Sequence, residues 1–339
     1  MNNEGTGVLF IAEISANHLG SLDRARKLVM EAARVGATAV KFQTYTADTM
    51  TLNINEFSVS DDHELWGGKR LYDLYKEAHT PWEWHKELFE LSRKLGLIPF
   101  SSPFDLSAVD FLESLNCPMY KIASLETGDH ALIRAVAKTG KPLIISTGAT
   151  EWDEIQELVE VVEETGNKNL TLLVCTSSYP AVAADAHLRR MLEIQEKLSV
   201  KVGVSDHTLG IGVSLAAVAL GAVAIEKHLT LSRSDGGADS AFSMEPSEFQ
   251  NLVLEGKNAF LSLGNREWSI QDSEKESRRL RRSLYIVKDV KAGDLLTLEN
   301  VRAIRPGEGC SPKFLDQLLG KRFSTDAKIG TPLRVEDVL

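Results

Sequence analysis

Two histidines stand at the ends of two neighbouring apolar runs, and a pair of imidazoles is the most chemically capable feature of this sequence. His207 follows the run 200–205, and His228 ends the run 223–228. A helix-like apolar stretch, 211–220, separates them, so two parallel strands would bring both rings to one edge of a sheet. The pair predicts a divalent metal site or an acid–base pair, with a hydrogen-bonded structural pair as the alternative.

Histidine combined with oxygen ligands suits Mn²⁺ or Mg²⁺ better than a closed zinc site. Asp206 and Glu226 are candidate ligands, or candidate partners that orient the histidines. Four other histidines stand in loops or at helix starts and are expected at the surface or as caps. They are His18, His63, His79 and His85.

Three lysines, Lys41, Lys121 and Lys227, also end apolar runs and predict an anion site. A buried lysine is costly without an anionic partner. Together with Ser and Thr hydroxyls, these lysines would neutralise phosphate or carboxylate groups. One alternative is permanent pairing with nearby glutamates, and another is a Schiff base on a lysine, which would make the protein an aldolase.

The elements that must position these residues form a repeated strand–helix pattern. Apolar runs typical of strands buried on both faces span 8–15, 39–44, 97–102, 119–124, 143–147, 171–175, 200–205 and 223–228. Amphipathic segments follow most of these runs, which predicts a parallel sheet with helical crossovers. Eight such units favour an α/β fold of the closed (β/α)8 type, a TIM barrel, over an open sheet. The polar run ends would then share the catalytic mouth.

The domain organisation follows from changes in composition along the 339 residues. Residues 1–265 form the predicted barrel, and 266–282 form a highly charged linker. Short strands broken by Gly, Asp and Pro predict a small β-rich domain over 283–339. The polar segment 53–76 is longer than an ordinary loop and is either a lid or an ordered excursion.

Bulk properties exclude several classes of function. The net charge is −10, which argues against a nucleic-acid or anionic-membrane partner. No apolar run is long enough to span a membrane. The three cysteines, Cys117, Cys175 and Cys310, are far apart and odd in number, so no disulfide framework is expected. We therefore expect a reducing compartment, the cytoplasm.

At this point the motifs, in chain order, resemble the sialic acid synthase family, enzymes that use phosphoenolpyruvate to make nine-carbon keto-sugar acids. The matching segments are 12–20, 41–44, 100–104, 120–124, 146–148, 175–180, 205–210 and 226–230. The tail segment 303–309 is similar to the antifreeze-like (SAF) domain of these enzymes. The resemblance implies a (β/α)8 barrel followed by that small domain.

The resemblance also implies a mechanism. His207 and His228 would hold a divalent ion that polarises the aldehyde of an open-chain acetamido sugar. The methylene carbon of phosphoenolpyruvate attacks that aldehyde, water adds, and phosphate leaves by C–O cleavage. Glu13 would be the general base or orient the water, kept ionised by the lysines around it.

Further site residues are implied by the same resemblance. Those expected to hold phosphoenolpyruvate are Lys41, Ser102, Lys121, Ser124, Ser146, Ser177 and Ser205. The further residues expected to bind substrate, chiefly the sugar, are Gln43, Glu126, Tyr179 and Asp239. Arg305 would reach the site from the small domain of a second copy, which makes the expected assembly a domain-swapped homodimer.

Within the family, segments 69–85 and 239–243 most resemble the branch that makes pseudaminic acid. The expected sugar is therefore a 2,4-diacetamido-2,4,6-trideoxy-hexose of altrose type. Precursors of legionaminate or N-acetylneuraminate are the alternatives, and a Schiff-base aldolase or a non-catalytic sugar-binding protein is less favoured. The Asp-Gly-Gly-Ala-Asp loop, 235–239, is the expected place for the choice of sugar.

Overall fold

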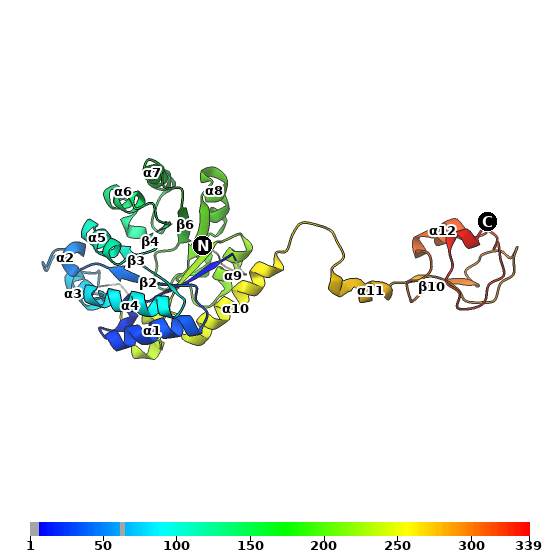
Figure 1. Ribbon diagram of the computed structural model, residues 1–339, viewed down its shortest axis with the longest axis horizontal. Coiled ribbons are helices and arrows are strands. Elements are labelled where there is room, and N and C mark those ends of the chain that lie inside the picture. Colours follow the sequence, from blue (N-terminus) through cyan, green and yellow to red (C-terminus); the bar gives the residue numbers. More distant parts are fainter. Residues whose placement is uncertain (1–6, 62–64) are drawn as a thin grey trace. The chain divides into compact units, whose positions relative to one another are not determined.

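The structure, a computed structural model, describes residues 7–61 and 65–339 (Figure 1). It divides into two compact units, with the division between Gly264 and Asn265. His63, expected at the surface, lies outside the described residues. Within the described part of the chain, no helix is long and apolar enough to cross a membrane.

The first unit is a closed barrel of eight parallel strands that pair in chain order. The strands are β1 (Leu9–Glu13), β2 (Ala39–Thr44), β3 (Ile98–Pro103), β4 (Tyr120–Ile122), β5 (Leu143–Ser146), β6 (Leu170–Cys175), β7 (Lys201–Ser205) and β8 (Ala224–His228). Each overlaps a run predicted from the sequence, so the predicted TIM barrel is confirmed. Figure 1 shows the helices arranged around the strands.

The helices of this unit cover the barrel with their apolar faces. They are α1 (Leu22–Arg34), α2 (Ala47–Met50), α3 (Leu71–Ala78), α4 (Trp82–Lys94), α5 (Leu106–Ser114), α6 (His130–Lys138), α7 (Trp152–Glu163), α8 (Arg189–Leu198), α9 (Gly212–Ala219) and α10 (Pro246–Ser262). Ser21 caps α1, because its hydroxyl accepts the backbone N–H of Arg24. Leu28, Val29 and Ala32 of α1 are fully buried, as the helical period requires.

The second unit has its own small core and contains the predicted small β-rich domain. Its elements are α11 (Lys275–Arg279), β9 (Ser283–Ile286), β10 (Val301–Ile304) and α12 (Leu315–Leu318). Strands β9 and β10 pair in antiparallel fashion. Buried apolar side chains from the strands and the loops, including Leu296, Phe323 and Leu333, pack into one cluster.

Two similar turns in this unit escaped the sequence analysis. Asp289–Gly293 and Asp326–Gly330 share the pattern Asp-x-Lys-x-Gly. Their final glycines have φ of +91° and +87°, a left-handed conformation that glycine adopts without steric cost. Val290 and Ala327, the second residues of the turns, exchange both of their backbone hydrogen bonds, at 2.9 and 3.0 Å. The two turns are thus halves of one paired arrangement.

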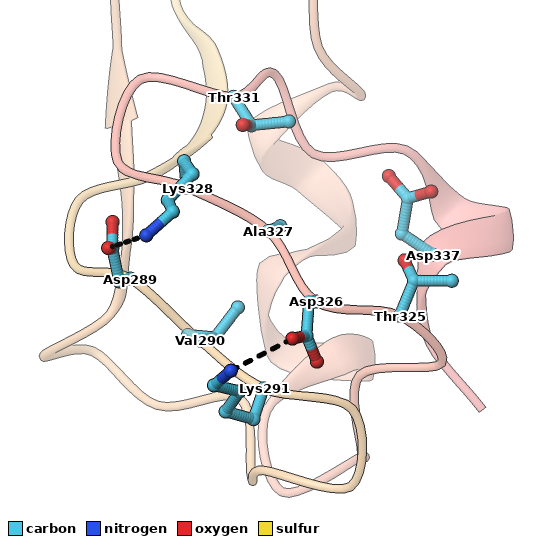
Figure 2. A pocket seen from close by; sticks show the side chains of 9 residues that line it. All are labelled: Asp289, Val290, Lys291, Thr325, Asp326, Ala327, Lys328, Thr331 and Asp337. Carbon is cyan, nitrogen blue, oxygen red and sulfur yellow. Dashed lines mark hydrogen bonds and ion pairs between the residues drawn. The ribbon is translucent and has the colours of Figure 1, made fainter.

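Each turn is closed by the aspartate of the other (Figure 2). Asp289 pairs with Lys328 at 2.7 Å, and Asp326 pairs with Lys291 at 3.1 Å. Each aspartate also accepts a backbone hydrogen bond of 2.9 Å from the fourth residue of the other turn. A surface pocket of about 360 Å³ lies beside these turns. Because the ion pairs are exposed, they fix the pairing of the turns more than they add stability.

Candidate active site

The strand register sets three of the predicted residues side by side at the barrel mouth. Glu13, the last residue of β1, is in register with Lys41 on β2 and with His228 on β8. Because side chains alternate along a strand, Glu226 faces the same side as His228, whereas Lys227 faces the opposite side. The carboxyl ends of the strands therefore gather acid, base and imidazole groups in one place.

A buried cluster of two lysines and two glutamates occupies the mouth. Lys41 Nζ lies 2.8 Å from Glu13 Oε2 and 3.5 Å from Glu226 Oε1. Lys121 Nζ lies 3.3 Å from the same Glu226 oxygen, which also accepts a hydrogen bond of 3.1 Å from Ser205. The four ionisable side chains are almost inaccessible to water. Both lysines are thus paired with glutamates, the arrangement considered from the sequence as an alternative to an anion site.

The two carboxylates of this cluster have opposite shifts in pKa. Burial raises the pKa of Glu13, although Lys41 and Gln43 both contact the carboxylate. The lysines were expected to keep Glu13 ionised, and Lys41 does lower its pKa, but the opposing effect of desolvation is larger. Burial would also raise the pKa of Glu226, but Lys121 and Lys41 lower it well below its usual value. Glu226 is thus the carboxylate that the lysines hold as an anion, and Glu13 is the one that binds a proton more tightly than usual.

Lys227 and Asp206 lie outside the mouth, in contrast to the prediction. Lys227 Nζ lies 3.1 Å from Asp206 Oδ2 and donates to the carbonyl oxygens of Thr208 and Gly210. Asp206 also accepts a hydrogen bond of 2.6 Å from Ser214 on α9. The pair therefore sits between the barrel wall and a helix. Lys227 is not part of the anion site, because it precedes the inward-facing His228 on β8. Asp206 comes directly after β7, and its carboxylate is paired with Lys227 and Ser214 rather than with the histidines.

The two predicted metal ligands adjoin each other. The ring centroids of His207 and His228 are 5.3 Å apart. The Nδ1 atom of His207 lies 3.1 Å from the carbonyl oxygen of Thr176, which leaves its Nε2 for a ligand. Burial lowers the pKa of His228 well below its usual value, and its Nδ1 has no hydrogen-bond partner among the described residues. His207 differs, because its contacts with Cys175 and the Thr176 carbonyl raise its pKa despite its burial. A metal ion binds the neutral form of imidazole, so His207 must lose any second proton before it binds the ion.

The protein offers few further ligands for such an ion. In the parts of the chain that the structure describes, no three His, Cys, Asp or Glu side chains are grouped as a metal site. Asp239 Oδ2 is 4.0 Å from His228 Nδ1. A two-histidine site fits a divalent ion whose other positions are filled by water and substrate oxygens.

Hydroxyl groups line the other side of the mouth. Ser124 Oγ accepts the backbone N–H of Gly148 at 3.0 Å, and Lys41 Nζ lies 3.4 Å from Ser102 Oγ. A Cβ atom on Gly148 would lie only 2.2 Å from Ser177 Oγ, so this glycine lets the loops after β5 and β6 approach each other. Gly148 belongs to the motif 146–148, in which only Ser146 was predicted to have a role.

Several buried polar atoms at the mouth have no hydrogen-bond partner among the described residues. They are Ser146 Oγ, Ser177 Oγ, Glu126 Oε2, Glu226 Oε2 and His228 Nδ1. Buried polar atoms are normally paired, so such a concentration is typical of a ligand-binding site. Glu126, in the 3-10 turn after β4, also has its pKa raised by burial to about 7.

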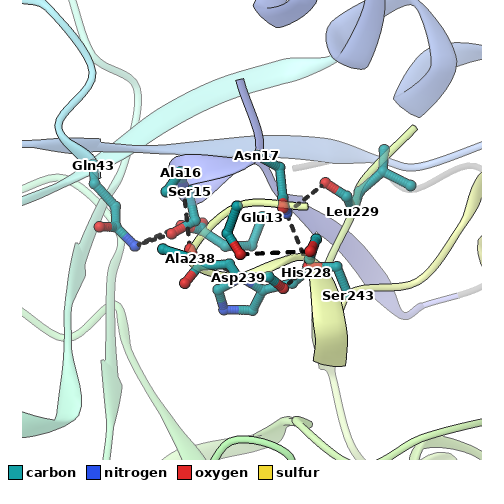
Figure 3. Close-up of polar contacts among 12 residues, drawn as sticks. Glu13, Ser15, Ala16, Asn17, Gln43, His228, Leu229, Ala238, Asp239 and Ser243 are labelled. Carbon is teal, nitrogen blue, oxygen red and sulfur yellow. Dashed lines mark hydrogen bonds and ion pairs between the residues drawn. The ribbon is translucent and has the colours of Figure 1, made fainter. Parts of the chain in front are cut away.

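The first and last strands of the barrel share a polar network that holds Asp239 (Figure 3). Asp239 Oδ2 accepts the backbone N–H of Ala16 at 3.2 Å. Asn17 Nδ2 donates to the carbonyl oxygen of Leu229 and to Ser243 Oγ, and Ser243 in turn donates to the backbone of Asp239. Asp239 is thereby fixed beside His228, as its predicted contact with the sugar requires.

Two expectations about histidines are wrong. His18 and His85 are 1% and 0% exposed, and burial lowers the pKa of each to about 4. His85 Nε2 lies 2.8 Å from Thr44 Oγ1, so it belongs to a polar contact between α4 and β2.

Arg305 lies in the second unit, directly after β10, and is exposed. Its contact with substrate stays a prediction.

Comparisons with known proteins agree with this geometry. A profile described as the NeuB family matches residues 28–268, and one described as the SAF domain matches residues 281–339. The chain is 44% identical over 329 residues to a pseudaminic acid synthase of Helicobacter pylori, covering 97% of both proteins. It is 36% identical to an N,N'-diacetyllegionaminic acid synthase of Legionella pneumophila, covering 97% and 94%.

Solved structures include a similar protein. The N-acetylneuraminic acid synthetase of Leptospira borgpetersenii, determined in complex with citrate, superposes with a TM-score of 0.72 at 33% identity. The match covers 80% of this chain and 90% of that one.

Proposed function

This chain belongs to the NeuB family, and from that premise we propose that it is a transferase that makes pseudaminic acid. It condenses phosphoenolpyruvate with an open-chain 2,4-diacetamido-2,4,6-trideoxy-hexose of altrose type and water, and releases inorganic phosphate. The higher identity to a pseudaminic acid synthase than to a legionaminic acid synthase supports this sugar. The legionaminate and N-acetylneuraminate precursors remain the alternatives to be tested.

One observation carries the proposal: the lysine–glutamate cluster and the histidine pair share one barrel mouth. Phosphoenolpyruvate brings a phosphate and a carboxylate, and Lys41 and Lys121 are the buried cations available to them. Ser102, Ser124, Ser146, Ser177 and Ser205 add hydroxyl groups around these lysines. A site of this composition is suited to an anion that must be held away from water.

The metal would be held by His207 and His228, and Mn²⁺ or Mg²⁺ is the expected ion. When bound, it supplies Lewis acidity to the aldehyde oxygen of the sugar. Asp239, Glu126, Gln43 and Tyr179 then orient the sugar chain. The protein thereby holds the aldehyde carbon against the methylene carbon of phosphoenolpyruvate, which is the main requirement for forming the C–C bond.

Glu13 acts as the general base for the water that adds to the substrate. The new C–C bond leaves a cationic carbon, formerly C2 of phosphoenolpyruvate, to which a water oxygen adds. Glu13, with its raised pKa, accepts one proton of that water, and the former aldehyde oxygen takes up a proton to become a hydroxyl. The C–O bond to phosphate then breaks as the new C2 hydroxyl becomes a ketone, and the proton of that hydroxyl leaves with the phosphate. The contact of Lys41 with Glu13 keeps the base and the phosphate-binding group in fixed relation.

We also propose a domain-swapped homodimer in which Arg305 completes the site of the other subunit. The free thiols of Cys117, Cys175 and Cys310 support a reducing compartment, the cytoplasm.

The deciding experiment offers the purified protein phosphoenolpyruvate and each candidate sugar, and measures phosphate release before and after chelation. We expect the altrose-type sugar to give the highest kcat/KM and the chelator to abolish turnover. Metal-independent turnover, with a sugar trapped on Lys121 by borohydride, would instead establish a Schiff-base aldolase. Sugar binding without any phosphate release would establish a non-catalytic binding protein.

A further inference from the structure

Three aromatic side chains form a continuous wall that begins at the histidine pair; we call Trp66, Tyr179 and Phe242 the aromatic wall. The Phe242 ring lies 4.9 Å from that of His228, and the Tyr179 ring lies 4.5 Å from that of His207. Tyr179 and Phe242 are 4.9 Å apart, and Trp66 lies 6.0 Å beyond Tyr179. The wall therefore runs from the predicted metal ligands outward.

Trp66 belongs to the long segment 53–76, whose two ends are hydrogen-bonded to each other. The prediction that this segment is an ordered excursion therefore holds for its two ends. Val59 N–H donates to the carbonyl oxygen of Lys69, and Leu71 N–H donates to that of Phe57, so the two ends of the excursion are paired. The indole N–H of Trp66 donates to the carbonyl oxygen of Ala238 at 3.0 Å. This bond joins the excursion to the loop that carries Asp239.

We propose that Trp66 selects the sugar by contacting its far end, the part from C4 to C6. This inference rests on the proposed function, in which the histidines fix the aldehyde at C1. An extended open-chain hexose has five C–C bonds of about 1.5 Å each. The ring-to-ring steps along the wall are 4.5 Å from His207 to Tyr179 and 6.0 Å from Tyr179 to Trp66, so a sugar held at C1 by the histidines extends past Tyr179 toward Trp66. Phe242 and Tyr179 would then lie beside the C2 acetamido group, and Trp66 beside C4 to C6.

The chemistry of the candidate sugars makes this position informative. N-acetylmannosamine has hydroxyl groups at C4 and C6, whereas the bis-acetamido sugar has an acetamido group and a methyl group there. An indole face favours methyl groups and does not satisfy a hydroxyl, because its single N–H is already bound to Ala238. A difference in fit at C4 and C6 between the two sugars corresponds to about a 10- to 100-fold difference in kcat/KM.

The test compares wild type with Trp66→Ala and Trp66→Phe on two sugars that share the C2 acetamido group, the bis-acetamido sugar and N-acetylmannosamine. Phosphate release gives kcat and KM, and calorimetry with the non-reacting alditols of both sugars gives Kd without turnover. We expect Trp66→Ala to lower kcat/KM for the bis-acetamido sugar about 10- to 100-fold, mostly through a higher KM. The kcat/KM for N-acetylmannosamine and the KM for phosphoenolpyruvate should be nearly unchanged. Trp66→Phe should retain most of the preference.

Controls separate the possible failures. Trp268→Ala replaces a fully exposed tryptophan of the second unit and should leave kcat/KM and Kd unchanged for both sugars. Phe242→Leu should weaken both sugars equally, since both carry the C2 group. Equal losses for both sugars in Trp66→Ala, or none, would overturn the inference while leaving the proposed function intact. Wild-type protein that neither binds an alditol nor releases phosphate would instead refute the proposed function.

Discussion

Lys41 Nζ lies 2.8 Å from Glu13 Oε2, and the two side chains are 5% and 0% exposed. This buried ion pair joins β1 to β2 at the point where the proposed reaction needs both an anion-binding group and a base. Because one lysine serves both needs, the charge of Glu13 and the binding of phosphoenolpyruvate are physically coupled.

Replacement of Glu13 by glutamine tests its role with water. The amide keeps the size of the side chain and its contact with Gln43, but it does not accept a proton. We expect kcat for phosphate release to fall by about 100-fold or more, while KM for phosphoenolpyruvate changes little. Glu160→Gln, at an exposed position of α7, is the matched control. A kcat within a few-fold of wild type would remove Glu13 from the chemistry.

The contrast between two buried lysines separates function from stability. Lys227→Met leaves Asp206 buried without its cation, so the free energy of unfolding should drop by about 3–5 kcal/mol. Lys121→Met should abolish activity at a temperature where the protein is still folded. Urea unfolding and phosphate release, measured on both variants, check this difference. The exposed Lys201→Ala should alter neither quantity. Equal activity losses in Lys121→Met and Lys227→Met would contradict the assignment of Lys227 to the outer wall.

Removal of one imidazole tests the metal site. His207→Ala should weaken Mn²⁺ binding by at least about 10-fold, measured by calorimetry or by the signal of free Mn²⁺ in electron paramagnetic resonance. His187, an exposed residue with φ of +41°, provides the control, since asparagine tolerates that conformation. His187→Asn should bind the ion like wild type. Unchanged Mn²⁺ affinity in His207→Ala would refute the two-histidine site.

Glu126 predicts a pH dependence of stability. Burial raises its pKa from 4.5 to about 7 in the folded protein, so between these values the folded state binds more protons than the unfolded state. Stability therefore decreases as pH rises through this window, by up to about 3 kcal/mol. Glu126→Gln removes this contribution, so its advantage over wild type should grow from pH 5 to pH 8 in urea unfolding. A constant difference between the two proteins would contradict the raised pKa.

A mixing experiment tests whether Arg305 acts on another subunit. Arg305→Ala and His207→Ala should each be inactive alone. If each site combines residues of two chains, random mixing after mild dissociation should restore about a quarter of wild-type activity, because one site in each mixed dimer is intact. Arg305→Lys, which keeps the charge, is the control for charge alone. Mixtures that stay inactive would place Arg305 in its own subunit's site or outside the site.

The barrel was predictable because its strands are short apolar runs followed by amphipathic segments, and these patterns decide the layers of an α/β fold. The placement of Glu13, Lys41 and His228 followed from the rule that strand ends share one mouth. Lys227 was assigned wrongly, although alternation along β8 places it opposite His228. His18 and His85 could not be placed, since their burial depends on distant partners such as Thr80 and Thr44.

The two reciprocal turns of the small unit have a consequence for how that unit folds. The aspartate that closes each turn comes from the other turn, 37 residues away in the repeat from Asp289 to Asp326. Neither turn is therefore complete in a fragment of the chain, and local order in one half requires the other half to be in place. The small unit should gain and lose its structure in a single cooperative step, with no stable half-folded form.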